Sequence, residues 1–345
     1  MNSRKETVDR AIEFRRPERV PVVFWNRDQA EGDVMLYHLS LGQPGDGDPL
    51  ANAWDWSTNE WGYRLESLDD GTMGHPTTAC WPELPPVEHI RVPALREEQR
   101  MAAVPAFAAE AGDRYRLASL DLSGFTVYTL LRGFENAMLD FVVAADHFQP
   151  VLDLVLDFEC QLLEMAARHG FHGIHFADDW GTQKGLMLSP ELWRTLFKPG
   201  YRRQFARAHE LGLHVWYHCC GNFGDIAADF HQIGVDVLNI SQPNTVDLER
   251  VGSQLRSRQC FLMPISYQTV SISGSPADIY AEAVRMHQLL ATSAGGFIGY
   301  VEEYGCMGMS GQNYRACGEA FRRLPPADGS GSGTSETARP NPSGG

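Results

Sequence analysis

The chain lacks any apolar run near the roughly 18 residues that cross a bilayer, and its first residues, Met-Asn-Ser-Arg-Lys-Glu, lack the apolar core of a secretory signal. We therefore expect a cytoplasmic protein that does not enter a membrane. Basic residues are also in deficit, because the formal net charge is −15 at pH 7. That charge argues against nonspecific nucleic-acid binding, which needs a basic surface. It still allows an anionic small molecule in a local basic pocket.

Cysteines are few and poorly placed for disulfides. The seven cysteines are odd in number and scattered, and two of them, Cys219 and Cys220, are adjacent. A reducing compartment is the simpler interpretation, with some thiols free to bind metal. A Gly-x-Gly-x-x-Gly turn after the first predicted strand is missing as well, so a dinucleotide-binding sheet loses support.

From residue 114 onward, apolar strands alternate with amphipathic helices. We predict strands over 19–25, 116–122, 173–177, 213–217, 235–240, 261–265 and 296–301. We predict helices over 4–14, 146–169, 189–210, 226–232, 248–257, 275–294 and 312–323. Because the connections are short and the strands are apolar throughout, this alternation predicts a parallel sheet covered by helices.

Two segments depart from this alternation. Residues 52–93 are rich in Trp, Gly, Asp and Pro without a clear period, which predicts a long irregular insertion of the kind that is usually functional. The last residues are mostly Gly, Ser, Pro and Thr, which predicts a disordered tail. We therefore expect one domain over residues 1–324, followed by the tail over 325–345.

Polar residues follow the end of nearly every predicted strand. They are Asn26-Arg27-Asp28, Asp178-Asp179, His218 to Cys220, Ser241-Gln242, Ser266-Tyr267-Gln268 and Glu302-Glu303. Polar groups at the carboxyl ends of successive strands are typical of an α/β barrel, in which the strand-to-helix loops ring a single site. We therefore predict a (β/α)8 TIM barrel rather than an open doubly wound sheet.

The segment Val215-Trp-Tyr-His-Cys-Cys-Gly-Asn222 carries a candidate metal half-site. His218 and Cys220 are two residues apart, so on a strand their side chains point to the same side. Imidazole and thiolate together suit zinc. The alternative is a buried strand that ends in small cysteines beside a core histidine. Cys219 should face the other way, into the core.

A catalytic zinc site keeps three protein ligands and one open position, so a third ligand is needed. Cys306 follows the last strand and barrel closure would bring it near. Glu302 and Glu303 lie closer to that strand's end and offer an oxygen instead. The sequence leaves this choice open.

Other charged residues are candidates with competing interpretations. Asp178 and Asp179 point to opposite faces of the strand end, so at most one of them faces the barrel mouth. The residue that does is a candidate acid or base, or a group that orients a ligand. Arg27 is suited to hold a carboxylate or phosphate, or else forms a surface salt bridge. Arg132 and Glu135 fit a buried pair that fixes a loop, or direct catalysis.

Taken in order, several stretches between about residues 6 and 322 resemble the uroporphyrinogen decarboxylase superfamily, whose fold is a (β/α)8 barrel. They are Pro17-Glu-Arg-Val-Pro-Val22, Asn59-Glu-Trp-Gly62, Gly71-Thr-Met-Gly74, Leu131-Arg-Gly-Phe-Glu-Asn136, Ala177-Asp-Asp-Trp-Gly-Thr-Gln183, Leu188-Ser-Pro-Glu191, Phe197-Lys-Pro199, His218-Cys-Cys-Gly-Asn222, Gly234-Val-Asp-Val-Leu-Asn239, Gly295-Gly-Phe-Ile298 and Gln312-Asn313.

Within that superfamily the chain is more similar to the zinc-dependent methyltransferases that work with corrinoid proteins. True decarboxylases carry Arg-Gln-Ala-Gly-Arg near the N-terminus, whereas residues 26–32 read Asn-Arg-Asp-Gln-Ala-Glu-Gly and lack the second arginine. The methyltransferases resemble one another in His-x-Cys followed far downstream by a cysteine. His218 and Cys220 match the first part. Glu303 stands where the downstream cysteine is expected, and Cys306 lies three residues on.

The resemblance implies an enzyme that moves a methyl group between methylcobalamin and a thiol or an oxygen atom. Zinc would be held by His218, Cys220 and either Cys306 or Glu303. The corrinoid would come on a partner protein or free in solution, and a homodimer would be ordinary for the family. The predicted catalytic residues are Asp179 and Tyr267, and the predicted substrate-binding residues are Arg27, Asp178, Gln242 and Gln268.

The Trp-rich segment 54–61 is predicted to cover the site as a lid. Two other functions remain open. One is a cofactor-free decarboxylase that acts on a polycarboxylate or tetrapyrrole, and the other is a barrel that binds a small ligand without catalysis.

Overall fold

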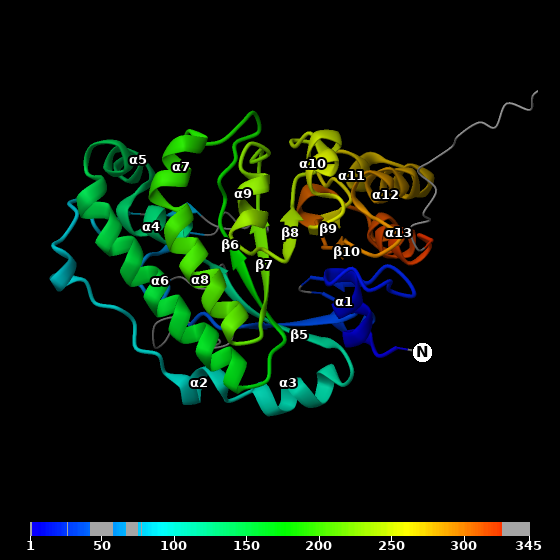
Figure 1. The fold of residues 1–345 in the computed structure, drawn as a ribbon, viewed down its shortest axis with the longest axis horizontal. Coiled ribbons are helices and arrows are strands. Elements are labelled where there is room, and N and C mark those ends of the chain that lie inside the picture. Colours follow the sequence, from blue (N-terminus) through cyan, green and yellow to red (C-terminus); the bar gives the residue numbers. More distant parts are fainter. Residues whose placement is uncertain (1, 26, 42–57, 67–74, 77, 326–345) are drawn as a thin grey trace, which may run out of the picture.

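The computed structural model describes residues 2–25, 27–41, 58–66, 75–76 and 78–325 (Figure 1). Eight parallel strands form its central sheet, in the order β1-β10-β9-β8-β7-β6-β5-β2. Their bounds are β1 Val22–Phe24, β2 Val34–His38, β5 Tyr115–Leu122, β6 Gly173–Ala177, β7 His214–Cys219, β8 Val237–Ile240, β9 Cys260–Pro264 and β10 Phe297–Val301. The (β/α)8 barrel predicted from polar strand ends is confirmed.

The first and last strands of this sheet, β1 and β2, meet through Asp33. The Asp33 amide donates to the Val22 carbonyl at 2.8 Å, and the Val22 amide donates to the Asp33 carboxylate at 2.8 Å. Arg19 pairs with the same carboxylate at 2.6 Å. These bonds bring the two edge strands together, so the carboxyl ends of all the strands surround one opening.

Helices cover the outside of the barrel and lie at both of its ends (Figure 1). They are α1 Arg4–Ile12, α2 Glu97–Met101, α3 Val104–Ala111, α4 Gly124–Arg132, α5 Phe134–Val143, α6 Ala145–Arg168, α7 Pro190–Leu196, α8 Lys198–Glu210, α9 Ala227–Gln232, α10 Leu248–Leu255, α11 Val270–Ser273, α12 Pro276–Leu290 and α13 Gly311–Arg322. In the described part of the chain, no helix is long and apolar enough to cross a membrane.

The predicted helix over 189–210 is two helices, α7 and α8. Ser189 caps the first by accepting a hydrogen bond from the Leu192 amide, as its sequence indicates. The division falls at Phe197, two residues before Pro199. Proline has no N–H to donate to the preceding turn and its ring crowds that turn, so the helix cannot continue unbroken there.

The segment predicted to be irregular carries little regular structure where it is described. It contains the short antiparallel pair β3 Leu65–Glu66 and β4 His75–Pro76 and the 3-10 turn η3 Val87–His89. Two further 3-10 turns are η1 Gln29–Glu31 and η4 Gly305–Met307. Half of the predicted lid, residues 54–57, and nearly all of the predicted tail lie outside the described residues.

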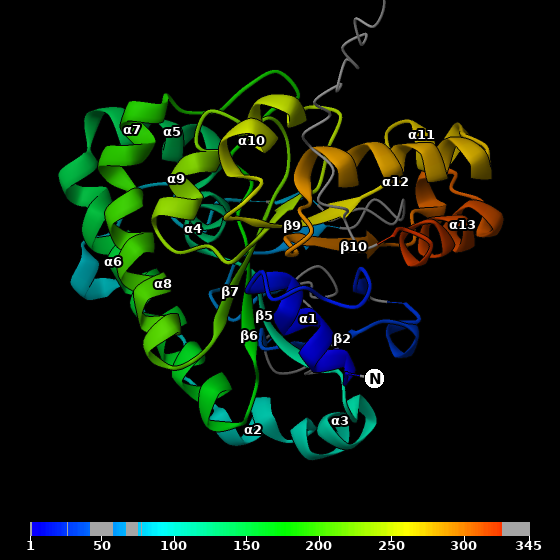
Figure 2. The ribbon, with the colours of Figure 1, turned by 45° about the vertical axis from the view of Figure 1, so that its right-hand side comes forward.

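The lower part of the barrel interior is apolar and closed. Leu117, Trp216 and Ile298 form one buried cluster there with Val8 and Ile12 of α1. Figure 2 shows α1 lying against β2 and β5. Helix α1 thus closes the amino end of the barrel, and only the carboxyl end is left to hold a site.

Candidate metal centre

The carboxyl end of the barrel interior is polar. Side chains alternate along a strand, so the residue two positions after an interior apolar residue also faces inward. Trp216 and Val237 belong to the apolar interior cluster, and the residues two positions on are His218 and Asn239. The inward-facing polar set is His38, Ser119, Asp121, His175, His218 and Asn239.

Three potential metal ligands converge at this end of the barrel. The His218 Nε2 atom lies 3.4 Å from Cys220 Sγ and 3.7 Å from Asp179 Oδ1. One ligand atom from each of the three residues lies within 4.8 Å of the others. The Cys220 amide also donates to Asp179 Oδ1 at 2.8 Å. Nitrogen, sulfur and oxygen donors in a set of three fit a catalytic zinc site with an open fourth position.

The Cys220 thiol is stabilised in its neutral form by the protein alone. Burial, followed by the Asp179 carboxylate, raises the pKa of this thiol well above its usual range. A bound divalent cation reverses that effect, since a coordinating thiol loses its proton. The arrangement therefore suits a thiolate that forms together with the metal complex.

Asn239 fixes the orientation of the His218 ring. Its Nδ2 atom donates to the Leu262 carbonyl at 2.7 Å, so its Oδ1 atom is the one that faces His218. The distance from that oxygen to His218 Nδ1 is 2.7 Å. Nδ1 must then carry the proton, which leaves the lone pair of Nε2 directed at Cys220 and Asp179.

Two glycines let the loops after β6 and β7 touch. A Cβ atom on Gly181 would lie 2.4 Å from the Asn222 amide nitrogen, and one on Gly221 would lie 2.1 Å from the Gly181 carbonyl oxygen. Gly221 also has φ of +71°, a region that favours glycine. The Asn222 amide donates to the Thr182 carbonyl at 2.7 Å. This close approach places Asp179 beside Cys220.

Asp178 and Asp179 separate as predicted, but Asp178 does not face the mouth. Its side chain is buried and accepts hydrogen bonds from the Phe125 and Thr126 amides at 3.2 and 2.6 Å, and from the Tyr201 hydroxyl. Burial raises its pKa to about 7. Asp178 is predicted to bind substrate, but in this structure its carboxylate fastens the start of α4 inside the protein.

Neither proposed third ligand from the last loop joins the cluster. Cys306 is exposed in η4. The Glu303 carboxylate folds back over Gly305, where an added Cβ would lie 2.4 Å from its Oε1 atom. Glu303 follows Glu302, which continues the inward face of β10, so alternation turns it outward. The oxygen donor in the structure is Asp179 instead.

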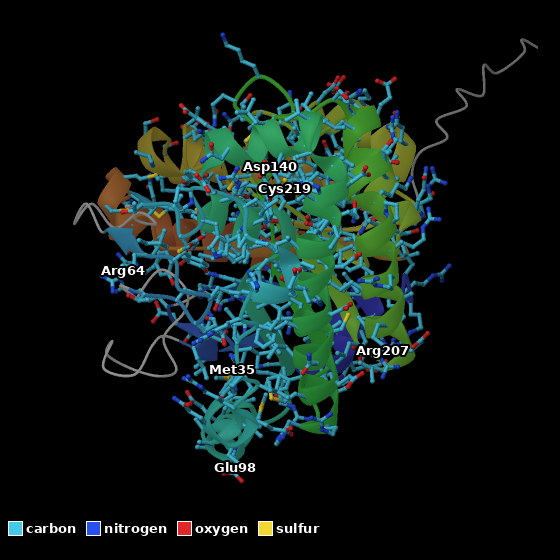
Figure 3. The ribbon with its side chains drawn as sticks, turned by 90° about the vertical axis from the view of Figure 1, so that its left-hand side faces the viewer. Met35, Arg64, Glu98, Asp140, Arg207 and Cys219 are labelled. Atoms are coloured by element: carbon cyan, nitrogen blue, oxygen red, sulfur yellow. The ribbon has the colours of Figure 1, made fainter. Side chains whose placement is uncertain are left out.

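The neighbouring cysteine lies in the core, as predicted. Cys219 is fully buried among the apolar residues outside the strands, and its sulfur accepts a hydrogen bond from the Trp180 amide at 3.4 Å. Figure 3 labels Cys219 near the upper end of the barrel, far from Glu98 at the lower end. Cys219, the last residue of β7, and Cys220, which follows it, thus face opposite ways.

The two predicted arginine roles both change. The Arg27 side chain is 63% exposed, pairs with Asp28 at 3.6 Å and lies over the Tyr314 ring, so the alternative of a surface salt bridge describes it. Arg132 pairs with Asp140 at 2.7 Å, not with Glu135. Glu135 is exposed in the first turn of α5, whereas Asp140 faces the protein.

Amide side chains from three loops form a chain of hydrogen bonds over the mouth. Gln242 donates to the Tyr267 hydroxyl at 2.7 Å and accepts from the Gly221 amide at 3.1 Å and from Gln183 at 2.8 Å. Gln268 donates to Gln183 at 3.2 Å. Burial raises the pKa of Tyr267 to about 12, so its hydroxyl stays protonated. Tyr267, Gln242 and Gln268 are thus joined at the mouth, and their roles in catalysis (Tyr267) and substrate binding (Gln242 and Gln268) stay predictions.

A second polar network crosses the barrel beside the candidate metal ligands, and the sequence did not indicate it. His38 Nδ1 lies 2.6 Å from Asp121 Oδ1, and Ser119 Oγ lies 3.0 Å from His175 Nδ1 and donates to Asp121 at 3.2 Å. Burial lowers the pKa of His175 well below its usual range. The one available signal was polar residues at alternate positions in otherwise apolar strands, namely Ser119, Asp121 and His175.

The fold and this site define a (β/α)8 barrel with a candidate metal centre at its carboxyl end. The chain belongs to the uroporphyrinogen decarboxylase (URO-D) family, whose sequence model matches residues 81–311.

Comparison with solved structures found a similar fold in a methyltransferase from Methanosarcina mazei. The TM-score is 0.69 at 16% sequence identity, over 93% of this chain and 98% of that one. A β-L-arabinopyranosidase of family GH27 from Geobacillus stearothermophilus gives a TM-score of 0.44 at 7% identity, over 89% and 76%. At 16% identity the likeness to the methyltransferase shows the fold alone. Comparison with curated proteins found no match.

Proposed function

We propose that this chain is a zinc-dependent methyltransferase that moves a methyl group between a corrinoid and a thiol or oxygen atom of a small substrate. The observation that carries the proposal is the convergence of His218, Cys220 and Asp179. The structural likeness to a protein described as a methyltransferase supports it. We assign the corrinoid to a partner protein or to solution, as the sequence indicates.

The protein's own residues provide the ligands and orient the substrate. His218, held by Asn239, offers Nε2, while Cys220 and Asp179 offer sulfur and oxygen. Zinc bound at this position would supply Lewis acidity, which lowers the pKa of a coordinated thiol or hydroxyl. Tyr267 and Gln242 are hydrogen-bonded to each other, and Gln242 also contacts the Gly221 amide next to Cys220, so the two would position the substrate's polar atoms.

The alternative of a polycarboxylate decarboxylase is less well supported by the geometry. Such an enzyme needs cationic groups to hold several carboxylates. Arg27 lies instead against Asp28 and Tyr314. The groups that contact the candidate ligands include the Asn239 amide, the Ser241 hydroxyl and loop backbone, with Gln242 and Tyr267 nearby. An acidic and neutral mouth favours neutral or cationic substrates.

The test is the metal content and activity of purified full-length protein. We expect about one zinc per chain, as a three-ligand site implies, and loss of that zinc in His218→Ala and Cys220→Ala. Cys219→Ala is the matched control, because it removes an adjacent thiol that faces the core, and it should keep its zinc. Methyl transfer from methylcobalamin to a thiol should follow zinc content. A protein that stays metal-free in zinc-replete medium would overturn the proposal.

A further inference from the structure

Glu302 is a half-buried carboxylate at the barrel mouth. Its Oε2 atom accepts hydrogen bonds from the hydroxyls of Tyr300 and Tyr304, both at 2.6 Å. Across the described ranges, no Lys, Arg or His side chain forms an ion pair with it. Ile298 and Tyr300 belong to the interior cluster, so alternation along β10 points Glu302 inward too. The carboxylate is therefore held in place and faces the opening without a cation.

The two tyrosines that hold this carboxylate each pack against another aromatic ring. The Tyr300 ring lies 5.6 Å from that of Trp25, and the Tyr304 ring stacks on Tyr267 at 4.4 Å. The two hydroxyls fix one carboxylate oxygen and leave Oε1 for a ligand. A carboxylate among aromatic rings suits an organic ammonium ion, because the ring faces and the anion both attract positive charge.

Contacts on two sides connect this group to the candidate metal centre. On one side, Tyr267 accepts a hydrogen bond from Gln242, which in turn accepts one from the Gly221 amide next to Cys220. On the other side, the Trp25 ring lies 4.7 Å from that of His175, whose ring lies 6.2 Å from that of His218. A ligand at Glu302 would therefore lie beside the metal ligands.

Metal binding would not neutralise Glu302. A zinc ion held by the Cys220 thiolate and the Asp179 carboxylate would have its two positive charges offset by two negative ones, so the third anion would stay uncompensated. A partly buried charge without a counter-charge is costly even when it accepts hydrogen bonds. A cationic ligand removes that cost, whereas a carboxylate ligand would increase it.

We propose that Glu302, with Tyr300, Tyr304 and Trp25, binds the positively charged end of a small N-methylated ammonium compound. That this compound is the substrate rests on the proposed function. The existence of the binding site does not depend on the metal. The group recognised is the ammonium, and the remainder of the ligand extends toward the metal ligands.

The experiment compares choline with its uncharged carbon isostere, 3,3-dimethylbutan-1-ol, by titration calorimetry on the zinc-loaded full-length protein. The two molecules have nearly the same shape and differ in charge. We expect choline to bind at least about tenfold more tightly, in the range that cation recognition by aromatic groups gives. Equal affinities, or no choline binding at millimolar concentration, would overturn the inference.

Matched variants locate the effect. Glu302→Gln removes one charge without a change of shape, and it should abolish the preference for choline. Glu303→Gln removes the same charge from the adjacent, outward-facing residue and should keep the preference. An equal loss in both variants would contradict the assignment. Zinc measured on the same samples separates the two proposals, since a metal-free protein that still prefers choline sinks only the methyltransferase assignment.

Discussion

The Asn239 side-chain oxygen lies 2.7 Å from His218 Nδ1, and pairing of β7 with β8 sets the two residues opposite each other. The same asparagine donates to the Leu262 carbonyl on β9. Three consecutive strands thus determine which nitrogen of one histidine faces the metal ligands. Ligand orientation at this centre is a property of the sheet register.

Replacing Asn239 by leucine should therefore weaken zinc binding while all three ligands remain. Loss of a partner that orients a histidine ligand typically costs about 10–100-fold in metal affinity. Competition with a chromophoric chelator measures this change. Asn244→Leu removes an exposed amide that bonds to Gln268 and should leave the affinity unchanged. Wild-type affinity in Asn239→Leu would show that the ring is oriented by other contacts.

The contact between the β6 and β7 loops gives a second prediction. Gly181→Ala would push a methyl group into the Asn222 amide and the Gly221 backbone, so the loops must separate and Asp179 must leave Cys220. We expect lower zinc affinity and lower stability. Gly185→Ala lies in the same loop, and its Cβ atom meets nothing within 4 Å. If both variants bind zinc equally, the loop contact does not position Asp179.

The strands and most helices were predictable because their patterns are local. The strand over 173–177 and the half-site at His218 and Cys220 need only an apolar run and a two-residue spacing. Helix α4 was missed because all nine of its residues are buried. A helix buried on every side shows no 3.6-residue period to detect. Strand β2, Val34–His38, was missed beside the irregular segment.

The rest of the site depends on contacts that the sequence does not reveal. The strand register pairs His218 with Asn239, and two glycines bring Asp179 to Cys220. The third ligand was sought in Cys306 or Glu303, because the family pattern places it there. The structure offers an oxygen from a different loop, since Glu303 folds outward over Gly305. Local spacing predicts half a metal site, and tertiary packing determines the other half.

Glu159 on α6 should make stability depend on pH. It is buried and accepts hydrogen bonds from the Gly124 amide at 2.9 Å and from Gln204 at 2.5 Å. Burial raises its pKa to about 8 from a usual 4.5. The folded protein then binds more protons than the unfolded chain between those values. The free energy of unfolding should fall as pH rises through that window, by up to about 1.4 kcal/mol per pH unit from this group.

Glu159→Gln isolates that effect. The side chain of the variant does not titrate at this position. The Gln204 Oε1 atom, which has no partner, can accept a hydrogen bond from the introduced side-chain amide. Urea unfolding at pH 5 and pH 8 should show a smaller difference in this variant than in the wild type. Glu164→Gln changes a half-exposed carboxylate on the same helix and should keep the wild-type difference in stability between the two pH values. If Glu159→Gln also keeps that difference, the buried carboxyl does not titrate as expected.

The pair between Arg132 and Asp140 should be a major source of stability around α4 and α5. Arg132 donates to the carboxylate at 2.7 Å and to the Trp81 and Pro82 carbonyls at 2.8 and 2.5 Å. Arg132→Met leaves a buried carboxylate without its cation, which typically costs about 3–5 kcal/mol. Adding Asp140→Asn should recover part of the lost free energy of unfolding, because it removes the buried charge that has no cation beside it. Glu135→Ala, which alters the exposed residue, should change the urea midpoint little. A large change of the urea midpoint in Glu135→Ala together with a small change in Arg132→Met would contradict this assignment. That result would support the Arg132–Glu135 pair considered from the sequence.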